Sequence, residues 1–194
     1  MGDHEVLATP RSLLIDPEQP LCYHLVSRCV RRAWLCGCNG ERNYAYRKRW
    51  IEQRLIRLAE AFAVDVLAFA IMSNHFHLVV YFDPNASKLW SLRDVAERWL
   101  RAFPVSDAEH EEAVERLLTQ PARLHRYRER LGSLSAFMQH LKQPIAVRIN
   151  REDSVKGHLF EQRFYSGALL DENAVLTAMR YVDLNPFRAR ITQT

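Results

Sequence analysis

The chain has 194 residues, enough for one sizeable hydrophobic core and too few for two. Its 48% hydrophobic and 26% charged residues, with only 6 Gly and 8 Pro, exclude collagen-like and Pro/Gly-rich disordered chains. No run approaches the roughly 18 apolar residues of a membrane-spanning helix, and the N-terminus lacks the pattern of a signal peptide. We therefore expect a cytoplasmic protein without a membrane partner.

In chain order, the first predicted elements are strands around one helix. Residues 21–30 are rich in Tyr, Val, Leu and Cys and predict a strand, and residues 33–38 predict a second, shorter one. Apolar residues at near-helical spacing predict an amphipathic helix over residues 43–63. Residues 64–72 and His75–Phe82 are apolar and strand-like. The short link between them predicts an antiparallel pair.

The middle of the chain predicts helices that begin at serine residues. The capping-box pattern, in which a serine is followed three residues later by an acidic residue, occurs at Ser91 with Asp94 and at Ser106 with Glu109. A further helix is expected to begin near Ser133 or Ser135. Pro144 is expected to kink or break that helix, because proline lacks the backbone N–H that a helix interior uses.

The last part of the chain predicts two short strands and a helix. Residues 157–160 and 164–170 have the composition of short strands. Asp171 is placed to cap a final helix over residues 172–184. The pair Asn185-Pro186 is expected to end it, because the residue before a proline is pushed out of the helical region.

These elements predict an α+β fold, a mostly antiparallel sheet with helices packed on it. No internal repeat and no linker divides the chain. We expect an N-terminal extension over residues 1–20, followed by a single domain over 21–194. Within that domain, residues 89–131 predict a helical insertion.

Charge is unevenly distributed, although the net charge is only +4. Residues 28–57 hold nine Lys or Arg against two acids, and residues 123–163 hold nine against four. Residues 104–120 reverse the sign, with five acids and one Arg. Two basic blocks around an acidic spacer suit a polyanion such as nucleic acid. An ordinary solvated surface explains the same pattern about as well.

The four cysteines lie in one 17-residue stretch, at positions 22, 29, 36 and 38. They contain no C-x-x-C pair, and their flanks are apolar, so buried reduced thiols are favoured over a zinc site.

The motif His75-Phe76-His77 is the sharpest local feature. Residues i and i+2 on a strand point to the same face, so both imidazoles can bind one metal ion while Phe76 packs on the other face. Two partly exposed histidines without a ligand are the alternative interpretation of this motif.

Tyr181 and Asn185 are four residues apart in the predicted final helix and therefore share one face. A phenol becomes an effective nucleophile when a metal ion withdraws charge from the phosphodiester under attack. An amide oxygen is a suitable ligand for Mg²⁺ or Mn²⁺. In the alternative interpretation, Tyr181 packs on the sheet and Asn185 caps the helix.

Four segments of the chain carry a resemblance to a known family. Residues 70–80 resemble the histidine–hydrophobe–histidine strand of the HUH endonuclease superfamily. The segment Arg180-Tyr181-Val182-Asp183-Leu184-Asn185-Pro186 is similar to the nucleophile helix of the REP-associated tyrosine transposases, a branch of the IS200-like single-tyrosine transposases. Residues 23–28 and 157–164 resemble that family's first strand and its glycine–aromatic–arginine stretch. The four segments follow family order over residues 22–191.

This resemblance implies an HUH-type transposase fold and metal-dependent transesterification of single-stranded DNA. Tyr181 would attack a phosphodiester, leaving a 5′-phosphotyrosine and a free 3′-hydroxyl. His75, His77 and Asn185 would hold Mg²⁺ or Mn²⁺, and no nucleotide cofactor is implied. The implied substrate is a repetitive, hairpin-forming DNA, bound by a monomer or homodimer. Its phosphates would be contacted by four arginines: Arg28, Arg31, Arg32 and Arg163.

Some features depart from the family or leave alternatives open. Phe187 stands where the family usually has a small aliphatic residue, and the chain stops earlier than the larger subgroup with this insertion. A retired transposase that only binds hairpin DNA or structured RNA is the main alternative, and an unrelated metal hydrolase or structural protein is the third. Tyr165 is the rival nucleophile, without a ligand partner four residues later.

Overall fold

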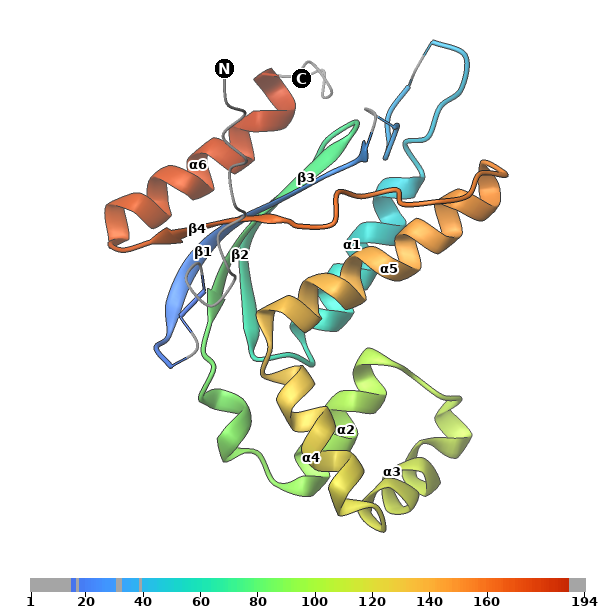
Figure 1. Ribbon diagram of the computed structural model, residues 1–194, viewed down its shortest axis with the longest axis vertical. Helices are drawn as coiled ribbons and strands as arrows, with labels where there is room; N and C mark the ends of the chain where they lie inside the picture. Colours follow the sequence, from blue (N-terminus) through green and yellow to red (C-terminus); the bar gives the residue numbers. More distant parts are fainter. Residues whose placement is uncertain (1–14, 17, 31–32, 39, 189–194) are drawn as a thin grey trace, which may run out of the picture.

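The computed structural model describes residues 15–16, 18–30, 33–38 and 40–188. Four strands form one antiparallel sheet in the order β2-β3-β1-β4 (Figure 1). The strands are β1 (Leu21–Arg28), β2 (Val64–Ile71), β3 (His75–Phe82) and β4 (Tyr165–Leu169). All three strand pairs are antiparallel, so the predicted α+β class and sheet are confirmed.

Helices cover both faces of the sheet and extend beyond one end of it (Figure 1). On one side lie α1 (Arg47–Ala59) and α5 (Leu134–Glu152), and on the other lies α6 (Glu172–Arg188). Beyond the end of the sheet the chain forms η3 (Ala86–Leu89), α2 (Leu92–Ala102), η4 (Asp107–Glu109), α3 (His110–Leu118) and α4 (Pro121–Leu131). None of the described helices is long and apolar enough to cross a membrane.

Side-chain alternation on β3 gives the sheet two different faces. Phe76 and Leu78 join the main core with α1 and α5, whereas His75 and His77 point to the opposite face, beneath α6. A bulge between Val66 and Ala68 shifts the alternation of β2. As a result, the small residues Ala68 and Ala70 pack with Val79, Ala178 and Val182 in a second cluster under α6.

Some predicted elements are shorter than expected or are replaced by other structure. Residues 33–38 form no strand, because the N–H groups of Leu35 and Cys36 both donate to the carbonyl of Ser73. The helix predicted over residues 43–63 is restricted to α1. Residues 157–160 contribute only an isolated bridge, between Phe160 and Cys29. Sequence patterns alone could not tell that these extended segments lack a neighbouring strand.

The cysteine prediction is partly right. Cys29 and Cys36 are buried free thiols, while Cys22 is half-buried and Cys38 is exposed. Burial raises the pKa of Cys29 to about 12 and that of Cys36 to about 11, so both thiols stay protonated at neutral pH.

Of the kink or break predicted at Pro144, the break does not occur, and α5 runs on to Glu152. A proline at position 144 leaves the carbonyl of His140 without its intrahelical donor. The Arg54 side chain of α1 supplies that donor, with its Nε 3.2 Å from the His140 oxygen. A contact from a distant part of the chain therefore compensates for the proline.

Helix ends follow the capping rules at some positions and not at others. Ser91 forms the predicted capping box with Asp94. Ser106 does not cap a helix with its side chain, and its hydroxyl donates to Glu109 instead. Asp171 accepts the N–H of Ala174, as predicted.

Two further helical features differ from the sequence prediction. Pro186 lies inside α6 instead of ending it, because α6 is packed on β2 and β3 along Ala178 and Val182. Helix α4 was not predicted, although its Pro121 occupies a first-turn position where proline is favoured.

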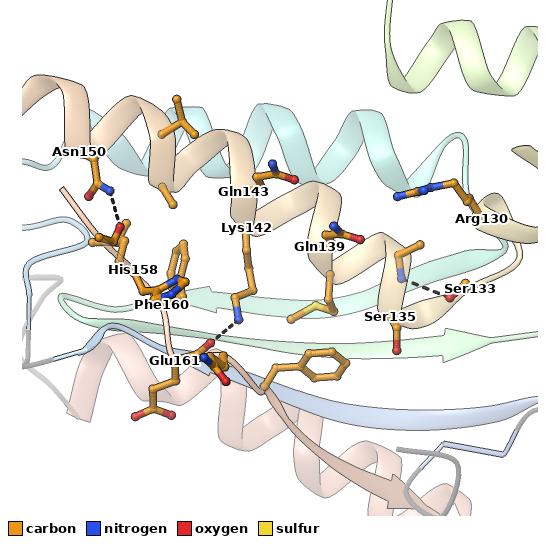
Figure 2. Close-up of a pocket in the computed structure, with 18 of the residues that line it drawn as sticks. Arg130, Ser133, Ser135, Gln139, Lys142, Gln143, Asn150, His158, Phe160 and Glu161 are labelled. Carbon is orange, nitrogen blue, oxygen red and sulfur yellow. Dashed lines mark hydrogen bonds between the residues drawn. The ribbon is translucent and has the colours of Figure 1, made fainter. Parts of the chain in front are cut away.

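The segment that precedes β4 is tied to α5 (Figure 2). Lys142 donates to the carbonyl of Glu161 at 2.9 Å, and Asn150 donates to that of Gly157 at 2.8 Å. Gly157 has a φ of +108°, which favours glycine. A cavity of about 970 Å³ runs along this contact. The segment then leads directly into Tyr165, at the start of β4.

His140 is expected to make the protein less stable at mildly acidic pH. Its Nε2 is buried without a partner among the described residues, and its ring contacts Phe103 and Trp99. Burial first, and then the charges of Arg130 and Arg54, lower the pKa of His140 to about 4. In the unfolded chain the ordinary value is about 6.5. Between these values the unfolded state binds more protons, so stability falls as pH falls.

Urea unfolding at pH 7 and pH 5 measures this effect. The free energy of unfolding is expected to fall less between pH 7 and pH 5 in His140→Phe than in the wild type. The difference is roughly 1 kcal/mol, because the His140 side chain is partly exposed and solvent screens its charge. His125→Phe, at an exposed position of α4, is the matched control and is expected to lose as much as the wild type. An unchanged pH dependence in His140→Phe would contradict the assignment.

Candidate functional site

The two histidines of β3 lie close together on the α6 face of the sheet. Their ring centroids are 4.9 Å apart and the ring planes meet at 77°. His77 is 5% exposed, and His75 is half-buried at the start of the strand. The structure therefore places both imidazoles on one face, as the strand alternation predicts.

Each histidine has its Nδ1 engaged. His75 Nδ1 lies 2.8 Å from Asn74 Oδ1, and His77 Nδ1 lies 3.0 Å from His24 Nε2. Because a carboxamide oxygen only accepts, His75 Nδ1 carries the hydrogen and its Nε2 carries the lone pair. The Nε2 of His77 is buried and has no partner among the described residues. This orphaned nitrogen is a candidate ligand atom.

Burial keeps these imidazoles in the form that binds metals. It is the main cause that lowers the pKa of His77 to about 4, and the nearby charges of His75, His24 and Arg28 contribute. Burial also lowers the pKa of His24, and burial together with Arg28 lowers that of His75. All three rings are thus neutral at pH 7, with lone pairs available.

Tyr181 of α6 lies over the histidines. Its ring centroid is 5.7 Å from that of His77 and 6.1 Å from that of His24, both edge to face. The tyrosine is 44% exposed and lines a cavity of about 910 Å³ with both of these histidines. The cavity walls include Arg28 and, on α6, Thr177. A buried histidine and an accessible phenol therefore meet in one open cavity.

Asn185 follows Tyr181 by one turn of α6 and is half-buried. Its amide nitrogen is buried without a partner in the described part of the chain. Its part as a metal ligand is still a prediction from the sequence.

The donor set fits a divalent metal ion. No group of three or more His, Cys, Asp or Glu side chains is arranged to hold a metal ion in the described residues, which are 15–188 without 17, 31, 32 and 39. The fit therefore rests on two neutral imidazoles, those of His75 and His77, of which the second has an orphaned Nε2. Neutral imidazole is a ligand for several divalent metal ions.

The predicted DNA-contacting arginines are divided between described and undescribed residues. Arg28 is exposed and lines the Tyr181 cavity, and Arg163 is exposed two residues before β4. Arg31 and Arg32 lie outside the described residues. Arg47 of the first basic block is fully buried, so this block offers fewer surface charges than its composition suggests.

His24 is the site residue that sequence reasoning missed. The alternation of β1 puts His24, Val26 and Arg28 on one face, and the pairing of Val26 with His77 aligns that face with the β3 histidines. The alternation could be read from the sequence, but the pairing could not. Tyr165, the rival nucleophile, also lines the cavity, 63% exposed and 6.4 Å between ring centroids from His24.

Several solved structures are similar to the chain, and two of them are described as transposases. No protein-family profile and no curated protein matches the chain. A REP-associated tyrosine transposase bound to a REP hairpin is similar with a TM-score of 0.48 and 10% sequence identity, over 87% of this chain and 68% of that chain. A candidate transposase from Deinococcus radiodurans R1 is similar with a TM-score of 0.35 and 17% identity, over 85% and 90% of the two chains.

Both proteins are transposases by description, the class whose motifs the sequence resembles.

Proposed function

We propose that the protein is a metal-dependent, HUH-type DNA transesterase of the transposase kind, with Tyr181 as its nucleophile. The observation that carries the proposal is that an accessible phenol lines one cavity with the neutral imidazole of His77, and that the His75 ring lies beside that imidazole. The Tyr181 and His77 rings are 5.7 Å apart, and His77 Nε2 is buried and unpaired.

In the proposed reaction, the hydroxyl of Tyr181 attacks the phosphorus of a phosphodiester. The phenol gives up its proton as a bond forms between its oxygen and phosphorus, and the bond from phosphorus to the 3′-oxygen breaks. The 3′-oxygen takes up one proton and leaves as a free 3′-hydroxyl, so no proton is gained or lost overall. The product is a 5′-phosphotyrosine that conserves the energy of the broken bond. Neither ATP nor another nucleotide cofactor is required.

His75 and His77, with Asn185 as a third candidate, would hold the metal ion. When bound, Mg²⁺ or Mn²⁺ supplies the positive charge that makes the phosphorus a better electrophile for a weak nucleophile. The fold holds the imidazoles on the rigid centre of the sheet and Tyr181 on the helix above them. Such placement of reacting groups on rigid elements contributes to rate by orientation.

Single-stranded or hairpin DNA is the proposed substrate. Arg28 lies in the wall of the cavity and offers a planar, bidentate contact to a phosphate. Arg163 is exposed beside β4 and would extend these contacts. Repetitive hairpin DNA of the REP type is the specific substrate we propose, from the resemblance of the sequence motifs.

Incubation with labelled single-stranded hairpin DNA and Mn²⁺ tests the proposed function. The expected result is a protease-sensitive covalent adduct, which disappears when EDTA removes the metal ion and returns when Mn²⁺ is restored. His77→Ala is expected to prevent the adduct even with Mn²⁺ present, whereas exposed His158→Ala is expected to leave it unchanged. DNA binding without an adduct under all conditions would instead support the non-catalytic binder.

A further inference from the structure

His24 makes a contact that places it directly behind a candidate metal ligand. Its Nε2 lies 3.0 Å from the Nδ1 of His77, and the two rings are nearly parallel, with centroids 5.2 Å apart and planes at 19°. His77 is almost completely buried and His24 is half-buried. A hydrogen-bonded pair of rings with this geometry restrains both the position and the rotation of the His77 ring.

We propose that His24 is a positioning residue that selects the tautomer of His77. In this assignment, Nδ1–H of His77 donates to Nε2 of His24, and the lone pair of His77 is held on Nε2, the nitrogen available to a divalent cation. The inference rests on the proposed function, because it gives His77 the role of a metal ligand.

The direction of this hydrogen bond decides whether His77 can bind a metal ion. If His24 were the donor, His77 Nε2 would carry the hydrogen and would be a buried donor without a partner. Such a nitrogen could not coordinate a cation. With His77 as the donor, its Nε2 presents a lone pair, and a bound cation satisfies it. Metal-binding histidines generally donate their second N–H to an acceptor that fixes the ring.

The same arrangement recurs at His75, which has a different acceptor. His75 Nδ1 is 2.8 Å from Asn74 Oδ1, an acceptor that forces the hydrogen onto Nδ1. Both candidate ligands would then present Nε2. For His77 no backbone carbonyl or carboxamide contacts the Nδ1 in the described part of the chain, and His24 is the partner it has.

The strand register explains why His24 reaches this place. Val26 is the direct partner of His77 across β1 and β3, so His24 is the diagonal neighbour on the same face. Ala70, the partner of His77 on β2, is small and leaves that side without an acceptor. The His24 ring also lies 6.1 Å from the Tyr181 ring and 6.4 Å from the Tyr165 ring, edge to face. The two tyrosine rings therefore restrict the rotation of the His24 ring.

Three variants of one position test the proposal through Mn²⁺ binding, measured by electron paramagnetic resonance without DNA. His24→Phe keeps an aromatic ring at this position but removes the acceptor, and its Mn²⁺ affinity is expected to fall about 10- to 100-fold. His24→Gln and His24→Asn restore an amide oxygen, and at least one is expected to recover most of the affinity. His158→Phe is the matched control, at an exposed position that does not line the Tyr181 cavity, and is expected to bind as the wild type does.

A measurement on the wild-type protein does not depend on any variant folding. Long-range ¹H–¹⁵N correlation of the metal-free protein at pH 7 is expected to show the hydrogen of His77 on Nδ1. A hydrogen on Nε2 would overturn the proposal, as would wild-type Mn²⁺ affinity in a folded His24→Phe protein. The proposed function fails separately: it is contradicted if His75→Ala and His77→Ala also bind Mn²⁺ as the wild type does.

Discussion

Tyr181→Phe is expected to abolish the covalent DNA adduct while leaving DNA binding nearly unchanged. The substitution removes the phenolic oxygen that would form the bond to phosphorus, and it keeps the ring that contacts His77 and His24. Loss of a nucleophile lowers turnover by roughly 10³-fold or more. The measurement is adduct yield on labelled hairpin DNA with Mn²⁺, together with the dissociation constant for the same DNA.

Tyr165→Phe is the matched control, because both tyrosines line the same cavity and both contact the His24 ring. Tyr165 lies at the start of β4, which β1 separates from the histidine strand β3, and among the described residues its ring does not contact that of His77 as the Tyr181 ring does. We expect the Tyr165→Phe protein to form the adduct. If the Tyr181→Phe protein forms the adduct and the Tyr165→Phe protein does not, the nucleophile is Tyr165.

The sequence predicts the histidine pair well because its geometry is local. Alternation along one strand is enough to place His75 and His77 on one face, and the apolar residues around them identify a central strand. The i+4 spacing in α6 likewise puts Tyr181 and Asn185 on one side of a helix. That α6 crosses the histidine side of the sheet, near Val79, depends on packing that no short sequence pattern records.

The errors occur where distant residues decide local structure. Pro144 is compatible with α5 because Arg54, about 90 positions earlier in the chain, donates to the carbonyl that the proline leaves free. The His24 contact depends on the register between β1 and β3, which is set across the intervening α1 and β2. Propensity rules describe neighbours along the chain, so tertiary hydrogen bonds of this kind lie outside them.

Arg47→Met is expected to lower the stability of the protein strongly, although Arg47 lies outside the site. Arg47 has a fully buried side chain, with its Nε 3.2 Å from a Glu152 carboxylate oxygen and its terminal nitrogens on Asp153 and the Trp34 carbonyl. The guanidinium also lies 4.1 Å from the centre of the Tyr44 ring. These contacts join the start of α1 to the end of α5.

Removing the guanidinium leaves two neighbouring carboxylates and a carbonyl without their shared donor. The pKa of Glu152 is already raised by burial and by Asp153, so the loss of Arg47 removes favourable charge from a site that disfavours the ionised form. Breaking a buried ion pair on one side costs about 3–5 kcal/mol. Glu152 and Asp153 are about 30% exposed and water solvates them in part, so we expect the lower end of that range, about 3 kcal/mol.

Urea unfolding followed by circular dichroism measures this difference, with the midpoint expected to fall and the slope to stay the same. Arg49→Met is the matched control, on the same helix and exposed, and should change stability by less than about 0.5 kcal/mol. Arg47→Lys keeps the positive charge but lacks the planar guanidinium that contacts both carboxylates and the carbonyl. The stability of the Arg47→Lys protein should therefore lie between those of the Arg47→Met and Arg49→Met proteins. Equal midpoints for Arg47→Met and Arg49→Met would show that the buried network contributes no net stability, and that the hydrophobic core alone holds α1 against α5.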